Sequence, residues 1–171
     1  FHPKKPLPIL LRYFEEVDLW RFTLPHLWEI RASLYNLYDY DFHLWNKLQK
    51  DFENKKTLQK YVKEGILIAE YERRKIENLV KRADLVRFHG VKALAVNSAM
   101  YSSELGSKLA EFFPPLGIVY SFVNGEARVS LRAYNKGKKK VDCGKFAKRY
   151  EGGGHRNSAG FVIPAGKPLP W

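Results

Sequence analysis

The sequence contains a single cysteine, Cys143, among its 171 residues, so the chain cannot form an internal disulfide. It also lacks the run of about 20 apolar residues that a membrane-spanning helix needs, and its first residues do not have the layout of a signal peptide. Acidic residues are few, because 18 Asp and Glu stand against 30 Lys and Arg, for a formal net charge of +12. We therefore expect a cytoplasmic protein from a reducing compartment, with a polyanionic partner and no membrane partner.

Metal-ligand spacing is also missing from the histidines, which are scattered as His2, His26, His43, His89 and His155. Glu16 and Asp18 are acidic residues two positions apart, which could meet on a metal if the backbone is extended. They could equally cap a helix or face solvent, and the residues alone favour that interpretation.

What the sequence does have is apolar mass, with 45 % hydrophobic and 15 % aromatic residues, enough for a core in one or two small domains. Between residues 28 and 81 the pattern is helical. Apolar residues recur at spacings of three and four in two groups: Trp28, Ala32 and Tyr35, then Phe42, Trp45 and Leu48. We expect these aromatic residues to lie in a core rather than to form a base-stacking surface. The segment from Leu58 to Lys81 contains no proline and predicts one long, partly exposed helix that joins two lobes.

The pattern changes after residue 84. Short strands are predicted at 84–88 and 91–96 around the turn His89-Gly90, followed by a helix over 102–112 with Ser102 or Ser103 as its N-cap. The dipeptide Asn124-Gly125 between two strand-like runs predicts a hairpin. The overall expectation is an α/β chain: a helical N-terminal segment, a long connecting helix, and a small α/β domain with a mixed sheet. Residues 164–171 are expected to be a tail.

Basic residues gather in the second half of the chain. Alternation along the second hairpin strand puts Arg128 and Arg132 on one face, where they would form either an anion clamp or a solvated outer face. A lysine-rich loop follows, with Lys136, Lys138, Lys139 and Lys140. Asp142 is the predicted N-cap of a short basic helix that runs to Tyr150 and leads into a glycine run.

Three consecutive glycines, Gly152, Gly153 and Gly154, are the most unusual feature of the sequence. Glycine has no side chain to bury, so we expect these residues to expose backbone N–H groups to an anion rather than to serve packing. His155 and Arg156 follow directly, and both can donate hydrogen bonds to phosphate. The pattern indicates a phosphate- or nucleotide-binding loop beside a sheet edge; a flexible connection is the alternative.

These segments together resemble a known family. The residues that carry the resemblance are Val129 to Arg132, Val141-Asp142, Phe146 to Tyr150 and Gly152 to Phe161. They are similar to the DHH-associated C-terminal domain of DHH-family phosphoesterases. Asp18 to Phe22 and Arg31 to Leu34 resemble the region where the catalytic domain ends in members related to oligoribonucleases and cyclic-dinucleotide phosphodiesterases.

The resemblance implies a two-lobed hydrolase with two divalent metals, usually manganese, in its N-terminal lobe and a substrate-gripping C-terminal lobe. It implies that Arg132 and His155 contact phosphate and that the backbone of Gly152 to Gly154 receives the nucleotide end. The substrate would be a short oligonucleotide or a dinucleotide. Family members often pair, so a homodimer is also implied.

The sequence departs from the family pattern by lacking the Asp-His-His motif. Since it also begins with Phe1, we expect the catalytic lobe to lie outside this chain, in the same or another polypeptide. Residues 1–30 would be the end of that lobe, 31–83 a helical connector and 84–171 the substrate-binding domain. Glu16 replaces the first aspartate of the family's last acidic motif, which leaves its metal role open, and Glu151 stands where a further glycine is common.

We thus expect the substrate-binding half of a manganese-dependent phosphodiesterase, which binds without cutting when alone. The alternative is a non-catalytic module for single-stranded nucleic acid, which would use the lysine loop and the basic helix.

Overall fold

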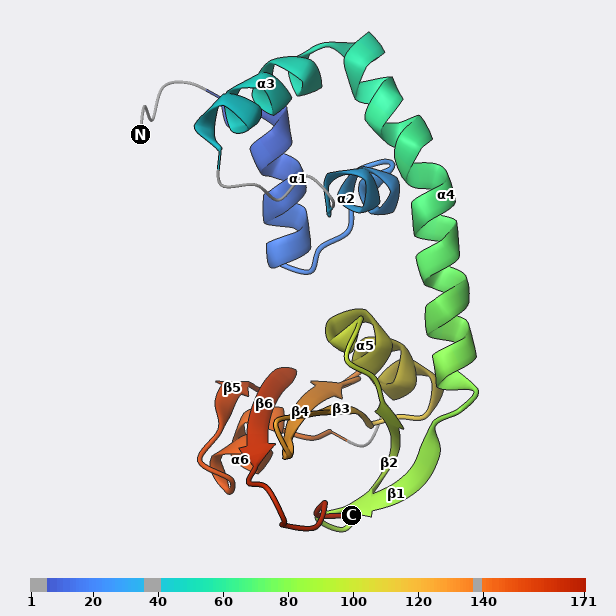
Figure 1. Ribbon diagram of the computed structural model, residues 1–171, viewed down its shortest axis with the longest axis vertical. Coiled ribbons are helices and arrows are strands. Elements are labelled where there is room, and N and C mark those ends of the chain that lie inside the picture. The colour runs from blue at the N-terminus through green and yellow to red at the C-terminus, as the bar shows by residue number, and fades with distance from the viewer. Residues whose placement is uncertain (1–5, 36–40, 137–139) are drawn as a thin grey trace. The chain divides into compact units, whose positions relative to one another are not determined.

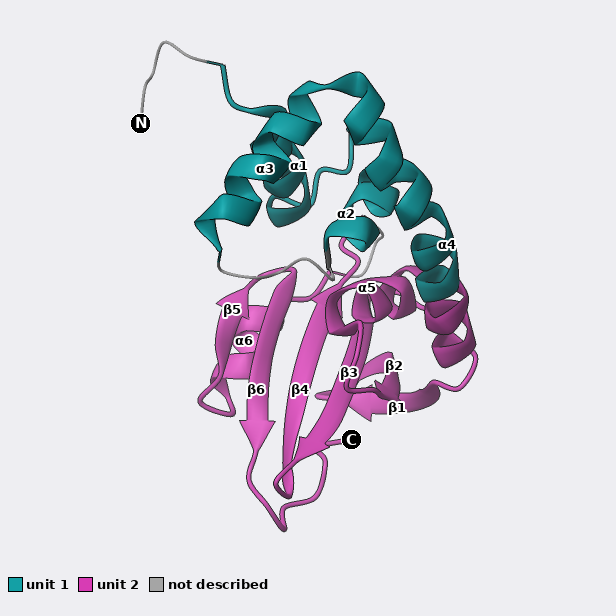
Figure 2. Cartoon of the chain, turned by 45° about the horizontal axis from the view of Figure 1, so that its top comes forward, with its two compact units in different colours: residues 1–73 teal, residues 74–171 magenta. Residues whose placement is uncertain are grey.

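The structure is a computed structural model that describes residues 6–35, 41–136 and 140–171. His2, Lys138 and Lys139 lie outside the described residues. The chain divides into two compact units, Phe1–Arg73 and Arg74–Trp171 (Figure 2). The division falls inside the long helix α4 (Lys55–Val80), and the domain boundaries expected at residues 30 and 83 stay predictions. Whether residues 1–30 are the end of a catalytic lobe remains a prediction.

Unit 1 is helical (Figure 1). Its elements are α1 (Ile9–Asp18), α2 (Leu27–Tyr35), α3 (Phe42–Glu53) and most of α4 (Lys55–Val80). The long helix predicted over 58–81 is therefore present as α4, with 26 residues. At Gly65 this helix comes so close to α2 that a Cβ atom would lie 1.7 Å from the carbonyl oxygen of Glu29. None of the described helices is both long and apolar enough to span a bilayer.

One apolar core joins α1, α2, α3 and α4. Its buried residues are Leu10, Tyr13, Leu27, Ile30, Leu34, Leu48, Phe52 and Val62. Trp45 packs against this core as expected, but Trp28 and Phe42 are exposed, so the predicted aromatic core holds for only part of that set. The helical spacing identified the apolar side of each helix, yet spacing alone does not say which end of that side another helix covers.

Unit 2 is built on a six-stranded mixed sheet in the order β1-β2-β3-β4-β6-β5. Its strands are β1 (Asp84–Phe88), β2 (Val91–Asn97), β3 (Leu116–Val123), β4 (Glu126–Ala133), β5 (Gly153–His155) and β6 (Ser158–Ile163). β2 and β3 are parallel and are connected through α5 (Ser102–Phe112), whereas the other neighbouring strands are antiparallel. The predicted α/β class, the turn at His89-Gly90 and the Asn124-Gly125 hairpin are all confirmed.

The two faces of the sheet are covered by different helices. The short helix α6 (Cys143–Lys148) packs on one face with the core residues of β3, β4 and β6. On the other face α5 and the end of α4 pack against Val96 and Val119. The end of the expected C-terminal tail packs against the core, because the half-buried ring of Trp171 lies 5.3 Å from Tyr120 and 6.1 Å from Phe88 between centroids.

The cap expected at the start of α5 is wrong. The N-cap residue is Tyr101, in the left-handed conformation with φ 59°, and it makes no side-chain capping bond. The hydroxyl of Ser103 instead accepts a hydrogen bond from Arg132 on β4. The local sequence around Ser103 does not reveal that the distant Arg132 binds its hydroxyl.

We expect Gly117→Ala to destabilise unit 2, because a Cβ atom at Gly117 would lie 2.2 Å from the carbonyl oxygen of Gly106 and would push α5 off the sheet. Overpacking of this kind typically costs about 1–3 kcal/mol. Urea unfolding followed by circular dichroism would measure the loss. Lys108→Ala, an exposed change in α5, serves as the control, and equal stability of both variants would contradict the close approach.

Candidate functional site

The glycine run forms part of a β-hairpin rather than an open loop. Gly153–His155 form β5, which pairs with β6, and Arg156-Asn157 make the turn between them. The turn is held from two sides, since the N–H of Cys143 donates to the Arg156 carbonyl at 2.8 Å and the N–H of Ala133 donates to the Asn157 carbonyl at 3.0 Å. The backbone of the run is therefore fixed by the start of α6 and the end of β4.

Two of the three glycines do serve packing, which corrects the expectation from the sequence. A Cβ atom at Gly152 would lie 2.3 Å from the Gly160 carbonyl oxygen. Gly154 has φ +136°, and a Cβ atom there would lie 2.5 Å from the Cα atom of Ala159. At Gly153, by contrast, an added Cβ would meet nothing within 4 Å. Gly153 is thus the one glycine of the run at which the fold has room for a side chain.

Strand register brings the predicted phosphate-binding residues together. Ser158 of β6 is opposite both Arg132 of β4 and His155 of β5. Directly opposed residues in antiparallel strands project from the same face of a sheet. Arg132, Ser158 and His155 therefore form one row across three strands.

The next row on that face carries almost no side chain. Gly160 is opposite both Ser130 of β4 and Gly153 of β5, and a third row holds Arg128 opposite Val162. We call the surface formed by these three rows the glycine face; it comprises Arg128, Ser130, Arg132, Gly153, His155, Ser158, Gly160 and Val162. A floor of glycines between basic side chains lets the backbone approach a ligand closely.

The glycine face lies opposite α6. Figure 2 shows α6 behind β5 and β6, whereas α5 lies in front of β3. In the described part of this unit, no helix packs on the near side of β5 and β6. Arg128, Gly153 and His155 are exposed, and Ser158 and Gly160 are half-buried. The described residues of unit 2 therefore leave this surface open to a ligand.

Arg132 is the most firmly held cation of the glycine face. One guanidinium nitrogen donates to the Ser103 hydroxyl at 2.7 Å and another donates to the Leu131 carbonyl at 2.9 Å. Burial lowers the pKa of Arg132, and the charge of nearby Glu104 works against that shift. An arginine nevertheless stays charged in proteins. Burial also raises the pKa of the neighbouring Cys143 thiol to about 12, so this thiol is uncharged at neutral pH.

The remaining basic residues surround this face less tightly. Arg156 is exposed in the turn after β5. Lys136 and Lys140 are exposed at the two ends of the lysine loop, and the ends of this loop are joined by Asn135. The Asn135 side-chain nitrogen donates to the Val141 carbonyl at 3.0 Å, and its oxygen accepts from the Val141 N–H at 2.9 Å. The same nitrogen donates to the Asn157 side chain at 2.7 Å, so the loop and the turn share one anchor.

Asp142 is the N-cap of α6, as predicted, and accepts from the Lys145 N–H at 3.0 Å. The helix ends at Lys148, two residues earlier than expected. Glu151, the residue before the glycine run, is exposed and has φ 58°. That conformation favours glycine, the residue the family resemblance places there.

Sequence reasoning missed Ser103, Ser130, Ser158 and Gly160. Pairing register and the position of α5 bring these residues to the face, and neither is visible in local sequence. An indication was available for Ser130, because the alternation of β4 already put it between Arg128 and Arg132, and for Ser158 and Gly160, which lie in the segment Gly152 to Phe161 that carries the family resemblance.

Glu16 and Asp18, the candidate metal ligands, lie at the end of α1. Glu16 is buried, and its Oε2 accepts from the Thr23 N–H at 2.6 Å and from the Thr23 hydroxyl at 2.8 Å. Its carboxylate therefore holds the α1–α2 loop. Within the described ranges there is no group of three or more His, Cys, Asp or Glu that could hold a metal ion. The described residues do not fit the two-metal site that the family resemblance implies.

Two curated proteins are similar to this chain over part of their own length. No protein-family model matches the sequence. The uncharacterized protein R106 of Acanthamoeba polyphaga mimivirus is 29 % identical over 171 residues, which cover 95 % of this chain and 39 % of that protein. Oligoribonuclease NrnB of Bacillus subtilis is 36 % identical over 96 residues, which cover 56 % of this chain and 22 % of that protein. The chain thus spans well under half the length of these curated relatives.

A solved structure shares the fold. The pGpG-specific phosphodiesterase PggH of Vibrio cholerae matches with a TM-score of 0.56 at 11 % identity, over 94 % of this chain and 63 % of that one. At such low identity the match concerns the fold alone. Together with the similarity to the oligoribonuclease, it supports a fold of the DHH phosphoesterase type.

Alanine substitutions should separate the glycines of the run. We expect Gly153→Ala to change the free energy of unfolding by less than about 0.5 kcal/mol, because the new methyl group enters open space. Gly154→Ala should cost more than about 1 kcal/mol, since it combines a positive φ with contact to Ala159. Chemical denaturation of the two variants tests this. Similar losses in both would mean that Gly153 is also required by packing.

Acid should weaken the α1–α2 loop through Glu16. The two hydrogen bonds from Thr23 lower the pKa of Glu16 below its ordinary value of 4.5. A carboxyl whose pKa is lowered in the folded state stabilises the fold above its ordinary pKa and ceases to do so as pH falls through the lowered one. Glu16→Gln should therefore be less stable than wild type at pH 7, and the gap should narrow below pH 4.5. A pH-independent gap in urea unfolding would rule this out.

Proposed function

We propose that this chain is the substrate-binding half of a metal-dependent phosphodiesterase that acts on short oligonucleotides or dinucleotides, with the catalytic metal ligands lying outside the chain. The observation that carries the proposal is the glycine face, where Arg132, Ser158 and His155 are in register beside Gly160 and Gly153. The similarity to an oligoribonuclease and to a pGpG-specific phosphodiesterase supports a substrate of this class.

Arg132 is the proposed primary phosphate ligand. Its guanidinium is already oriented by Ser103 and the Leu131 carbonyl, so little side-chain freedom is lost when a phosphate arrives. Hydrogen bonds between arginine and phosphate are charge-assisted and among the stronger ones in proteins. His155 and Ser158, in the same row, would donate to further phosphate oxygens.

The two glycines of the second row would supply room rather than contacts. With no side chain at Gly153 or Gly160, a ribose can lie directly on the sheet next to the phosphate. Arg128 in the third row and Arg156 in the turn would neutralise further phosphate charge. The face would thus bind one end of a short substrate and position the next phosphodiester bond for a catalytic lobe.

Hydrolysis itself is not assigned to these residues. The sequence has no Asp-His-His motif, and Glu16 is engaged by Thr23. We therefore expect the isolated chain to bind a dinucleotide without cutting it. Manganese and the catalytic lobe remain proposals about the whole protein, as does a homodimer.

Replacing Arg132 should weaken dinucleotide binding strongly. We expect Arg132→Ala to raise the dissociation constant for pGpG about 10- to 100-fold, since hydrogen bonds to charged groups contribute about 1.5–3 kcal/mol. Isothermal titration calorimetry would measure it. Arg87→Ala is the matched control, because Arg87 is an exposed strand arginine on β1 at the opposite edge of the sheet.

His155→Ala provides a second variant, since His155 is exposed and its loss should leave the fold intact even if Arg132→Ala does not. Unchanged affinity in both variants would refute the phosphate-binding role.

The dependence of affinity on ligand length and salt distinguishes the proposed function from the alternative, a module for single-stranded nucleic acid. A pocket for a nucleotide end should favour short ligands. A general nucleic-acid surface should favour long ligands and lose affinity steeply as the salt concentration rises.

A further inference from the structure

In unit 1 a group of aromatic side chains spans the loop between α1 and α2 and the start of α2, with Phe22 half-buried against the core and Trp20 and Trp28 exposed. The rings of Trp20 and Phe22 meet edge to face at 4.7 Å between centroids, and Phe22 stacks on Trp28 at 4.8 Å with an interplanar angle of 23°. Trp20 is 46 % exposed and Trp28 is 42 % exposed. The guanidinium carbon of Arg31 lies 5.6 Å from the centre of the Trp28 ring. We call these four residues the aromatic cluster.

Two members of this cluster, Trp20 and Phe22, have unfavourable backbone conformations, as does His26 in the same loop. Trp20, Phe22 and His26 have φ angles of 55°, 56° and 56°. Bulky residues seldom adopt this left-handed region, and such outliers concentrate at ligand-binding sites. The surrounding structure therefore maintains these backbone conformations.

Trp20 occupies a position where glycine is the usual residue. The N–H of Trp20 donates to the Val17 carbonyl at 3.2 Å, and the N–H of Arg21 donates to the Glu16 carbonyl at 2.9 Å. This pair of bonds is the Schellman motif that ends many helices, and its left-handed residue is commonly glycine. Here an indole stands at that residue and projects into solvent, which the end of α1 does not require.

The loop that carries the cluster is firmly anchored. The buried carboxylate of Glu16 accepts both hydrogen bonds from Thr23, and the Tyr13 hydroxyl donates to the Pro25 carbonyl at 2.9 Å. A rigid aromatic surface loses little entropy when a flat ligand stacks on it.

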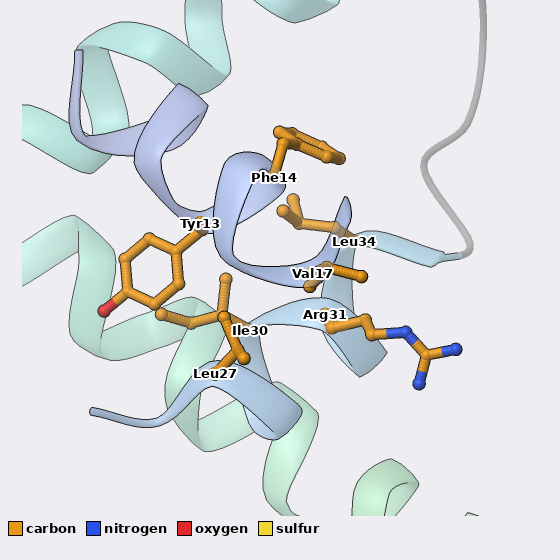
Figure 3. Close-up of a pocket in the computed structure, with 7 residues that line it drawn as sticks. All are labelled: Tyr13, Phe14, Val17, Leu27, Ile30, Arg31 and Leu34. Atoms are coloured by element: carbon orange, nitrogen blue, oxygen red, sulfur yellow. The ribbon is translucent and has the colours of Figure 1, made fainter. Parts of the chain in front are cut away.

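The pocket that shares Arg31 with the cluster is too small to bind a nucleobase. Figure 3 shows a small hollow between α1 and α2, with Tyr13, Ile30 and Leu34 among its lining residues and the guanidinium of Arg31 pointing away from it. Its volume is about 30 Å³, far too small for a nucleobase. A ligand of that size would have to stack on the exposed rings.

We propose that the aromatic cluster is a stacking site for an unpaired nucleobase of a single-stranded oligonucleotide. Exposed indole rings stack on bases of any sequence, and an adjacent arginine attracts the phosphates that accompany them. The formal net charge of +12 favours the same ligand over an uncharged one. The ligand class is the one proposed above, so this inference rests on the proposed function, although its residues all belong to unit 1.

Trp20→Gly in the full chain tests the site. Glycine suits the left-handed position, so the variant should fold normally while losing the exposed indole. With a single-stranded DNA hexanucleotide as probe, we expect fluorescence anisotropy to show binding about fivefold to a hundredfold weaker than wild type, the range measured for loss of one base–aromatic stack. Trp20→Phe should retain most of the affinity. Phe42→Ala, which removes a ring 83 % exposed in the same unit, should leave it unchanged.

A matched abasic hexanucleotide separates this site from the phosphate site. Trp20→Gly should not weaken its binding further, because it offers no base to stack. Arg132→Ala should weaken binding of both probes. Wild-type affinity of Trp20→Gly for the normal probe, or an equal loss in Phe42→Ala, would overturn the stacking site and leave the phosphate site standing. An effect of Trp20→Gly without any effect of Arg132→Ala would overturn the phosphate site alone.

Discussion

The antiparallel register of β4, β6 and β5 is the constraint on which the glycine face depends. Because side chains alternate along a strand, a slip of one residue would turn Ser158 and His155 to the α6 side and bury them in the core. Core residues enforce the register: Ala159, Phe161 and Ile163 are buried against α6, so β6 cannot shift without exposing them. The arrangement of polar residues on one face is thus secured by apolar packing on the other.

The sequence was informative where structure is local. Asn124-Gly125 specified a hairpin, alternation along β4 specified its buried face, and Asp142 specified a helix start. It was misleading where two distant segments touch. Gly152 and Gly154 lack side chains because β6 lies close to them, and Trp171 packs against the core through its ring contacts with Phe88 and Tyr120. Such contacts depend on the assembled sheet, which no short pattern encodes.

Both units place residues other than glycine at positive φ, among them Tyr101 and Glu151 in unit 2, but Gly154 and the pair Trp20 and Phe22 differ in what the conformation serves. At Gly154 unit 2 uses the residue that tolerates an unusual φ, and thereby lets two strands approach. At Trp20 and Phe22 unit 1 uses large aromatic residues in a conformation that disfavours them. The first choice follows from sheet packing. The second is not explained by the end of α1, which is why it draws attention to the side chains themselves.

Because Asn135 joins the two ends of the lysine loop, the geometry of the sheet does not depend on the length of that loop. The Asn135 side chain bonds the backbone of Val141 in both directions and also reaches Asn157, so β4, α6 and the β5–β6 turn stay joined whatever lies between residues 135 and 141. The entropy cost of closing a loop rises only slowly with its length. Natural insertions and engineered tags can therefore be accommodated at this point without disturbing the neighbouring strands, which makes it a natural attachment point for a surface tether or a reporter group.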